Sequence, residues 1–169
     1  TPGTKIFEYA RKNLDAIITV PDEDLVVAFL DMVENHKMIV ENSGLLTVAA
    51  LKQLNVKNKR VVSILSGGNM DVITMSSVVQ QGLIMRDRIF TVSVLLPDKP
   101  GELSRVADVI AKKNGNVIKL EHNQFVSINR NAAVELRITL EAFGTEHKNQ
   151  IIEALNESGY KPKLVQAKI

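Results

Sequence analysis

The sequence predicts two regions of different fold class, an α/β region over residues 1–81 and an α+β, ferredoxin-like βαββαβ region over residues 88–169. In the first region, short runs rich in β-branched residues alternate with helical patterns. In the second, apolar and polar residues alternate along strand-length segments. The rhythm changes across residues 82–87, which we interpret as a linker. The 169 residues, of which 45% are hydrophobic, suffice for two small cores.

The first region is predicted to form part of a parallel sheet with helices on its faces. Three apolar runs have the β-branched density of strands buried on both sides, at residues 16–20, 38–40 and 61–65. Helical patterns alternate with these runs, around residues 6–10 and across residues 22–33, 45–54 and 72–79. The resulting order, αβαβαβα, is typical of parallel α/β architecture.

The second region is predicted to form a four-stranded antiparallel sheet with both helices on one face. One side of its first strand is apolar, with Phe90, Val92, Val94 and Leu96. Its first helix has an apolar stripe of Leu103, Val106, Ala107 and Ile110. Further elements are expected as strands at residues 116–124, 134–141 and 160–167, and as a helix from residue 145 with Ile151, Ile152 and Leu155 facing inward.

Composition excludes several classes of function. Lys and Arg number 21 against 19 Asp and Glu, and the charges are scattered, so we expect no nucleic-acid partner. No apolar run approaches the roughly 20 residues that cross a bilayer, and no secretory leader is recognisable, so we expect no membrane partner and a cytoplasmic location. The absence of cysteine excludes disulfides, a thiolate nucleophile and sulfur-based zinc sites.

The first candidate ligand site lies where the first strand of the second region meets its helix, at Asp98-Lys99-Pro100-Gly101. Free N–H groups at a helix N-terminus attract an anion, and Gly101 has no side chain to obstruct it. Asp98 is suited to a ligand ammonium group or to capping the helix. A tight turn without a ligand is the alternative reading. The candidate set is Asp98, Lys99, Pro100, Gly101, Glu102, Leu103, Asn116 and Val117.

The second candidate site is the turn Ser66-Gly67-Gly68-Asn69, between an expected strand and a helix. Open parallel sheets place ligands at this end of their strands, and two glycines permit close backbone approach. The Ser66 hydroxyl suits an unprotonated ring nitrogen. The turn matches neither a dinucleotide-binding nor a Walker motif, and a purely structural turn is the alternative.

Residues 88–167 resemble the ACT family of amino-acid-sensing domains. The resemblance rests on the βαββαβ order, on Pro100-Gly101 followed by Glu102-Leu103, and on Asn-Gly-Asn-Val at residues 114–117. It implies that an amino-acid effector binds between the first loop and the second strand, where two such domains pair edge to edge as a homo-oligomer. His122 is then either an interface or ligand residue, or merely structural.

Residues 61–71, read with residues 40–44, resemble the threonine dehydratase (threonine ammonia-lyase) family of fold type II pyridoxal phosphate enzymes. The resemblance implies that Ser66 faces the pyridine nitrogen of pyridoxal phosphate, with Gly67, Gly68 and Asn69 beside the cofactor. It also implies a cation site near Glu41, although a Glu41 that caps the next helix is equally compatible. The chain would then comprise the C-terminal portion of the catalytic domain (1–81), a linker (82–87) and an ACT domain (88–169).

The lysine that binds the cofactor covalently, and the loop that holds its phosphate, have no match in this sequence. We therefore expect the chain to be a fragment that neither binds pyridoxal phosphate nor catalyses the conversion of threonine to 2-oxobutanoate by itself. The alternative is a non-catalytic amino-acid-binding regulator that acts through a partner. Isoleucine, valine, threonine and serine fit equally well as effectors, in a biosynthetic or a catabolic enzyme.

Overall fold

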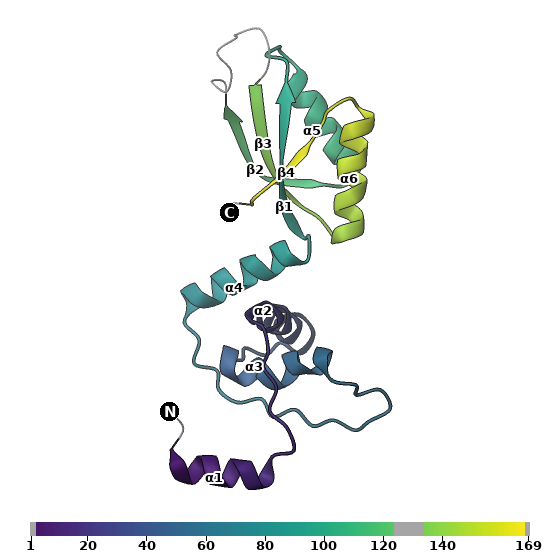
Figure 1. Ribbon diagram of the computed structural model, residues 1–169. Coiled ribbons are helices and arrows are strands. Elements are labelled where there is room, and N and C mark those ends of the chain that lie inside the picture. The colour runs from purple at the N-terminus through teal and green to yellow at the C-terminus, as the bar shows by residue number, and fades with distance from the viewer. Residues whose placement is uncertain (1–2, 124–133, 168–169) are drawn as a thin grey trace. The chain divides into compact units, whose positions relative to one another are not determined.

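The computed structural model describes residues 3–123 and 134–167. The chain divides into two compact units, Thr1–Met75 and Ser76–Ile169, and each is described by itself (Figure 1). No helix within the described ranges is both long and apolar enough to cross a membrane.

The first unit is helical. Its elements are α1 (Thr4–Asn13), α2 (Asp22–Asp31), a π-helical turn (Met32–His36), α3 (Asn42–Ala49) and a 3-10 turn (Ala50–Gln53). Helix α2 begins after Pro21 with three acidic residues, which complement the helix dipole. Its buried face includes Phe29 and packs against α3, where Leu45 is fully buried. The helices predicted around residues 6–10 and across 22–33 and 45–54 are confirmed.

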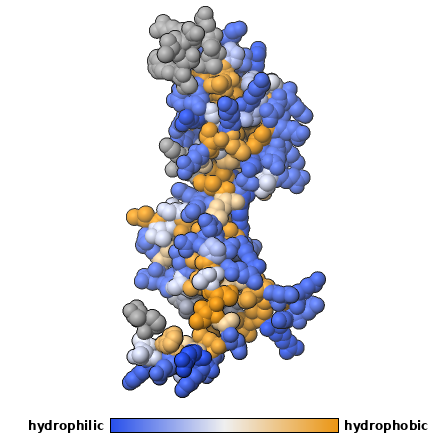
Figure 2. Space-filling view, viewed as in Figure 1, coloured by the Kyte–Doolittle hydropathy of each residue, from blue (hydrophilic) through white to orange (hydrophobic). Residues whose placement is uncertain are grey.

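The parallel sheet predicted for the first region is wrong. Within the described part of residues 1–75, the runs at 16–20, 38–40 and 61–65 form no strand. Of the β-branched side chains that suggested buried strands, Ile17, Val62 and Ile64 are 82%, 90% and 73% exposed, whereas Val40 is buried. A strand depends on hydrogen bonds and packing from neighbouring strands, and β propensity alone does not supply them. Figure 2 shows apolar side chains reaching the surface of the chain.

The second unit contains β1 (Ile89–Leu96), α5 (Glu102–Lys112), β2 (Asn116–Asn123), β3 (Val134–Glu141), α6 (Thr145–Glu157) and β4 (Lys163–Val165). The strands form one sheet in the order β2-β3-β1-β4, and every neighbouring pair is antiparallel. The predicted βαββαβ arrangement is confirmed. The last strand is shorter than the expected 160–167.

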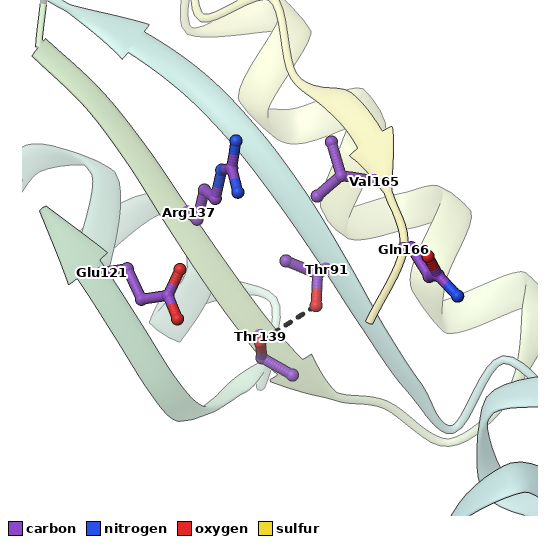
Figure 3. Close-up of a pocket in the computed structure, with 6 residues that line it drawn as sticks. All are labelled: Thr91, Glu121, Arg137, Thr139, Val165 and Gln166. Atoms are coloured by element: carbon purple, nitrogen blue, oxygen red, sulfur yellow. Dashed lines mark hydrogen bonds between the residues drawn. The ribbon is translucent and has the colours of Figure 1, made fainter. Parts of the chain in front are cut away.

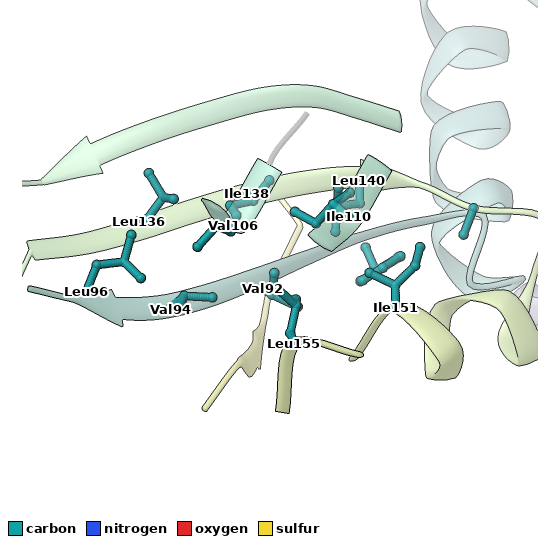
Figure 4. Close-up of a cluster of buried hydrophobic side chains, with 12 residues drawn as sticks. Val92, Val94, Leu96, Val106, Ile110, Leu136, Ile138, Leu140, Ile151 and Leu155 are labelled. Atoms are coloured by element: carbon teal, nitrogen blue, oxygen red, sulfur yellow. The ribbon is translucent and has the colours of Figure 1, made fainter. Parts of the chain in front are cut away.

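The core of the second unit lies between the sheet and its two helices (Figure 4). The strands contribute Phe90, Val92, Val94, Leu96, Leu136, Ile138 and Leu140, and the helices contribute Val106, Ile110, Ile151 and Leu155. Leu103 and Ala107 belong to the predicted stripe of α5 but are exposed, so the buried face of that helix is narrower than the sequence indicated. Ile152 is partly buried against the core.

Helix α4 (Val72–Met85) crosses the boundary between the two units. Asp71 begins it by accepting a hydrogen bond from the Thr74 N–H at 2.9 Å. The segment expected as a linker, 82–87, is helical through Met85, and Gly82 is buried. Asp87 then turns the chain into β1 with a left-handed φ of 55°.

Candidate functional site

The turn after β1 is built around Gly101, whose φ of 91° lies in the left-handed region that favours glycine. Lys99 donates its N–H to Pro97 O at 2.8 Å, and Arg105 donates its N–H to Gly101 O at 3.1 Å. A Cβ at Gly101 would meet no heavy atom within 4 Å. The turn therefore leaves open space in front of the first turn of α5, where N–H groups lack helical partners.

A pocket of about 330 Å³ lies at this turn. Its lining includes the six turn residues that the sequence singled out, Asp98, Lys99, Pro100, Gly101, Glu102 and Leu103. The opposite wall is aliphatic, with Leu96, Val134 and Leu136, and His122 borders it. The pocket thus joins the N-terminus of α5, the carboxylates of Asp98 and Glu102, and apolar side chains.

The other two predicted residues, Asn116 and Val117, lie at the opposite end of the sheet. Asn116 pairs with Glu141 and donates from Nδ2 to Glu141 Oε2 at 3.1 Å. Leu96, which precedes the turn, pairs with Val134 instead. Seven residues of strand separate the two ends, or roughly 20 Å. A single chain therefore does not combine Asn116 with the 98–103 turn.

The edge strand β2 is exposed along almost its whole length. Val117, Ile118 and Leu120 on this strand are each about two fifths exposed, and Leu103 on α5 is 44% exposed. An edge strand presents unpaired backbone N–H and C=O groups, and here they are accompanied by apolar side chains.

The 66–69 turn is held by Glu41. Its carboxylate accepts hydrogen bonds from the Asn69 N–H at 3.2 Å and from the Ser43 hydroxyl at 2.7 Å. The Glu41 N–H in turn donates to Gly67 O at 3.2 Å. Glu41 occupies the N-cap position of α3, but its side chain makes no capping bond, so the capping interpretation is wrong.

Two glycines permit this close approach. A Cβ on Gly44 would lie 1.8 Å from Ser66 O, and one on Gly67 would lie 2.3 Å from Glu41 Oε1. Thr47 adds a hydrogen bond from its hydroxyl to Ile64 O at 3.1 Å. Ser66 itself is exposed, so its hydroxyl is accessible at the surface of this unit.

The cation site predicted near Glu41 stays a prediction. In residues 3–123 and 134–167, no group of three or more histidine or acidic side chains is placed to hold a metal ion.

His122 joins the predicted turn residues in the pocket. Its position could be inferred from the sequence, because His122 shares a strand face with Leu120 and lies near the end of β2 that adjoins the turn. The separation of Asn116 could also be inferred. In this topology β1 and β2 are both antiparallel to β3, so the end of β1 and the start of β2 lie at opposite ends of the sheet.

No family model matches the chain. An L-threonine ammonia-lyase of Thermotoga maritima is 30% identical over 97% of this chain and 41% of its own length. An L-threonine ammonia-lyase of Geobacter sulfurreducens is 34% identical over 94% of this chain and 40% of its own length. Among solved structures, a prephenate dehydratase from Streptococcus mutans matches 45% of this chain and 40% of its own, at 21% identity and a TM-score of 0.39.

The chain thus spans about two fifths of the length of these curated relatives. The matches nevertheless extend over nearly all of its residues and include both units. The chain is therefore similar, along nearly all of its own length, to part of these two L-threonine ammonia-lyases.

Proposed function

We propose that the second unit is an ACT-type regulatory domain of a threonine ammonia-lyase and binds an amino-acid effector at the 98–103 turn. The observation that carries this proposal is the pocket of about 330 Å³ that opens where left-handed Gly101 starts α5. The effector carboxylate bonds to N–H groups of the first turn of α5, and the helix dipole adds attraction. The Asp98 carboxylate faces the ammonium group.

The aliphatic wall of the pocket receives the effector side chain. Leu103, which is 44% exposed, provides apolar surface, and the nearly buried Leu96, Val134 and Leu136 bring no polar group that could bond a hydroxyl. Isoleucine or valine therefore fits this wall better than serine or threonine. His122 at the rim offers a ring nitrogen to the polar end of the ligand.

A second copy of the chain completes the site. If two β2 edges pair antiparallel about a two-fold axis, the start of one β2 lies beside the end of the other. The end of β2 adjoins the 98–103 turn, because β1 and β2 run in the same direction. Asn116 and Val117 of the partner subunit would then face the turn. The exposed apolar side chains of β2 and α5 support this pairing.

Effector binding at such an interface regulates the parent enzyme by favouring one of two assemblies. The parent would convert threonine to 2-oxobutanoate and ammonia with pyridoxal phosphate, which supplies an electron sink when bound. In this chain, the exposed Ser66 hydroxyl and the 66–69 backbone would contact the cofactor ring. The Glu41 and Gly44 contacts support this role, because they fix the turn while leaving Ser66 accessible.

A non-catalytic regulator that acts through a partner is the second candidate. Its domain would bind the effector in the same way, but it would have no need of a fixed 66–69 turn. The hydrogen bonds that hold this turn to Glu41 therefore favour the enzyme.

Complementation between variants tests the shared site. Gly101→Asp and Asn116→Ala should each abolish effector binding, measured by calorimetry. Random exchange of subunits between the two variants should restore binding at about a quarter of the sites. About half of the dimers would then be mixed, and one of the two sites in each mixed dimer would combine an unmutated turn with an unmutated Asn116. Gly159→Asp is the matched control, since Gly159 also has a positive φ with open space around it but lies outside the pocket. Unchanged binding by Asn116→Ala would contradict the shared site.

A further inference from the structure

A polar recess of about 130 Å³ lies on the face of the sheet that the helices leave uncovered. Its lining consists of Thr91, Glu121, Arg137, Thr139, Val165 and Gln166 (Figure 3). The recess contains no residue of either predicted site, and it is separated from the 98–103 pocket by the sheet itself, since Thr91 alternates with core residues of β1.

The floor of the recess is a pair of hydroxyl groups. Thr91 on β1 is opposite Thr139 on β3, and their hydroxyl oxygens lie 2.9 Å apart. The two residues are 5% and 4% exposed, although they lie outside the apolar core. Two hydroxyls have two protons, and their mutual hydrogen bond uses one. One buried O–H therefore remains to donate to a ligand.

The walls of the recess have opposite charges. Glu121 on β2 is directly opposite Arg137 on β3. Each side chain nevertheless forms its ion pair along its own strand: Lys119 Nζ lies 3.1 Å from Glu121 Oε1, and Arg137 Nε lies 3.1 Å from Glu135 Oε1. The space between the two walls stays open, and the guanidinium group retains Nη donors beyond the Nε that is engaged.

We propose that this recess binds a small zwitterionic α-amino acid. The ligand carboxylate bonds to the Arg137 guanidinium, its ammonium group to the Glu121 carboxylate, and the remaining hydroxyl proton of the threonine pair to a ligand oxygen. The volume of about 130 Å³ suits a small amino acid such as alanine, serine or threonine better than an aromatic one. The proposal does not depend on the role of the 98–103 turn.

Titration of the 15N-labelled full chain tests the recess. We expect L-serine, L-alanine and L-threonine to shift the amide signals of Thr91, Arg137 and Thr139 in a saturable manner. Propionate and propylamine each have only one of the two charges and should bind at least tenfold more weakly, as should L-phenylalanine, which exceeds the volume.

Variants distinguish specific binding in the recess from nonspecific attraction between the ligand and charged side chains. Arg137→Gln should abolish the saturable shifts, and Thr139→Val, which keeps the side-chain shape, should weaken binding roughly tenfold, as for the loss of one hydrogen bond. Lys163→Gln is the matched control, because Lys163 lies on the same face, opposite Ser93, without lining the recess. It should bind as the wild type does.

Three results would overturn the proposal. The first is no saturable shift at these amides with any of the small amino acids at millimolar concentration. The second is equal weakening by Arg137→Gln and Lys163→Gln, which would show nonspecific attraction. The third is a set of shifts that follows the protein concentration instead of the ligand concentration, which would assign this face to contacts between copies of the chain.

Discussion

Lys148 Nζ donates a hydrogen bond to Asp87 Oδ1 at 2.6 Å, and so connects the segment between α4 and β1 to α6. Thr145 donates to the other carboxylate oxygen at 2.8 Å. The hydrogen bond from Lys148, supported by the one from Thr145, lowers the pKa of the Asp87 carboxyl below its usual value. Both members of the ion pair are largely shielded, with side-chain exposures of 26% for Asp87 and 14% for Lys148.

Replacing Asp87 by Asn should lower the free energy of unfolding by about 1 kcal/mol at pH 7. Asn tolerates the left-handed φ, so the change removes mainly the charge. Because the pKa of Asp87 is lowered by folding, its contribution is present above the unfolded value and is lost as the pH falls through the folded value. Urea denaturation should therefore show a smaller difference between variant and wild type at pH 3 than at pH 7. Asp108→Asn, on the exposed face of α5, is the control. If Asp87→Asn lowered the free energy of unfolding equally at pH 3 and pH 7, the account would be contradicted.

His147 should adopt the neutral tautomer protonated at Nε2. Its Nε2 lies 2.6 Å from Lys113 O, and a carbonyl oxygen can only accept, so Nε2 must donate. Its Nδ1 accepts the Phe143 N–H at 3.0 Å and therefore bears no proton. Long-range 1H–15N spectra at pH 8 should show one protonated and one unprotonated ring nitrogen of His147, each at its own 15N chemical shift. Ring signals averaged between the two tautomers would contradict this geometry, and the exposed His36 provides the averaged reference.

Gly44→Ala should detach the 66–69 turn from α3. The new Cβ would overlap Ser66 O, which is backbone and cannot move aside as a side chain can. The Asn69 and Glu41 amides, which the turn engages, should then exchange with solvent at least tenfold faster than in the wild type. Gly68→Ala is the matched control, because its Cβ would meet only Ile39 O, at 3.4 Å. Wild-type protection in Gly44→Ala would show that the contact is dispensable.

Leu155→Ala should destabilise the second unit by about 2–5 kcal/mol, since it deletes a fully buried side chain between α6 and the sheet. Leu164→Ala on β4 removes the same atoms from a residue that is 57% exposed and should cost less than about 1 kcal/mol. Urea denaturation followed by far-UV circular dichroism measures both. Similar losses for the two variants would contradict the placement of the core.

The fold of the second unit was predictable because its signals are local. The alternation over residues 134–141 places Leu136 and Ile138 on the core face regardless of what surrounds the strand. The apolar runs of the first unit lack such a signal. Val62 and Ile64 have strand propensity, but only neighbouring strands could turn that propensity into a sheet.

The sequence predicted which turn residues line the candidate site, but it did not predict that Asn116 lies away from them. Pro100 and Gly101 identified the turn, and the structure places a pocket there. The sequence grouped Asn116 with the turn residues, but in the structure Asn116 lies at the other end of the sheet. The polar recess escaped detection because Thr91, Thr139 and Arg137 look like ordinary outward-facing strand residues, and only the register brings them together.

Calorimetric titration of the full chain with each of the twenty amino acids tests the central claim most directly, that the 98–103 turn binds an effector. We expect heat from at least one branched aliphatic amino acid, its loss in Gly101→Asp and its retention in Gly159→Asp. No heat from any branched aliphatic amino acid, or full retention of that heat in Gly101→Asp, would contradict the account.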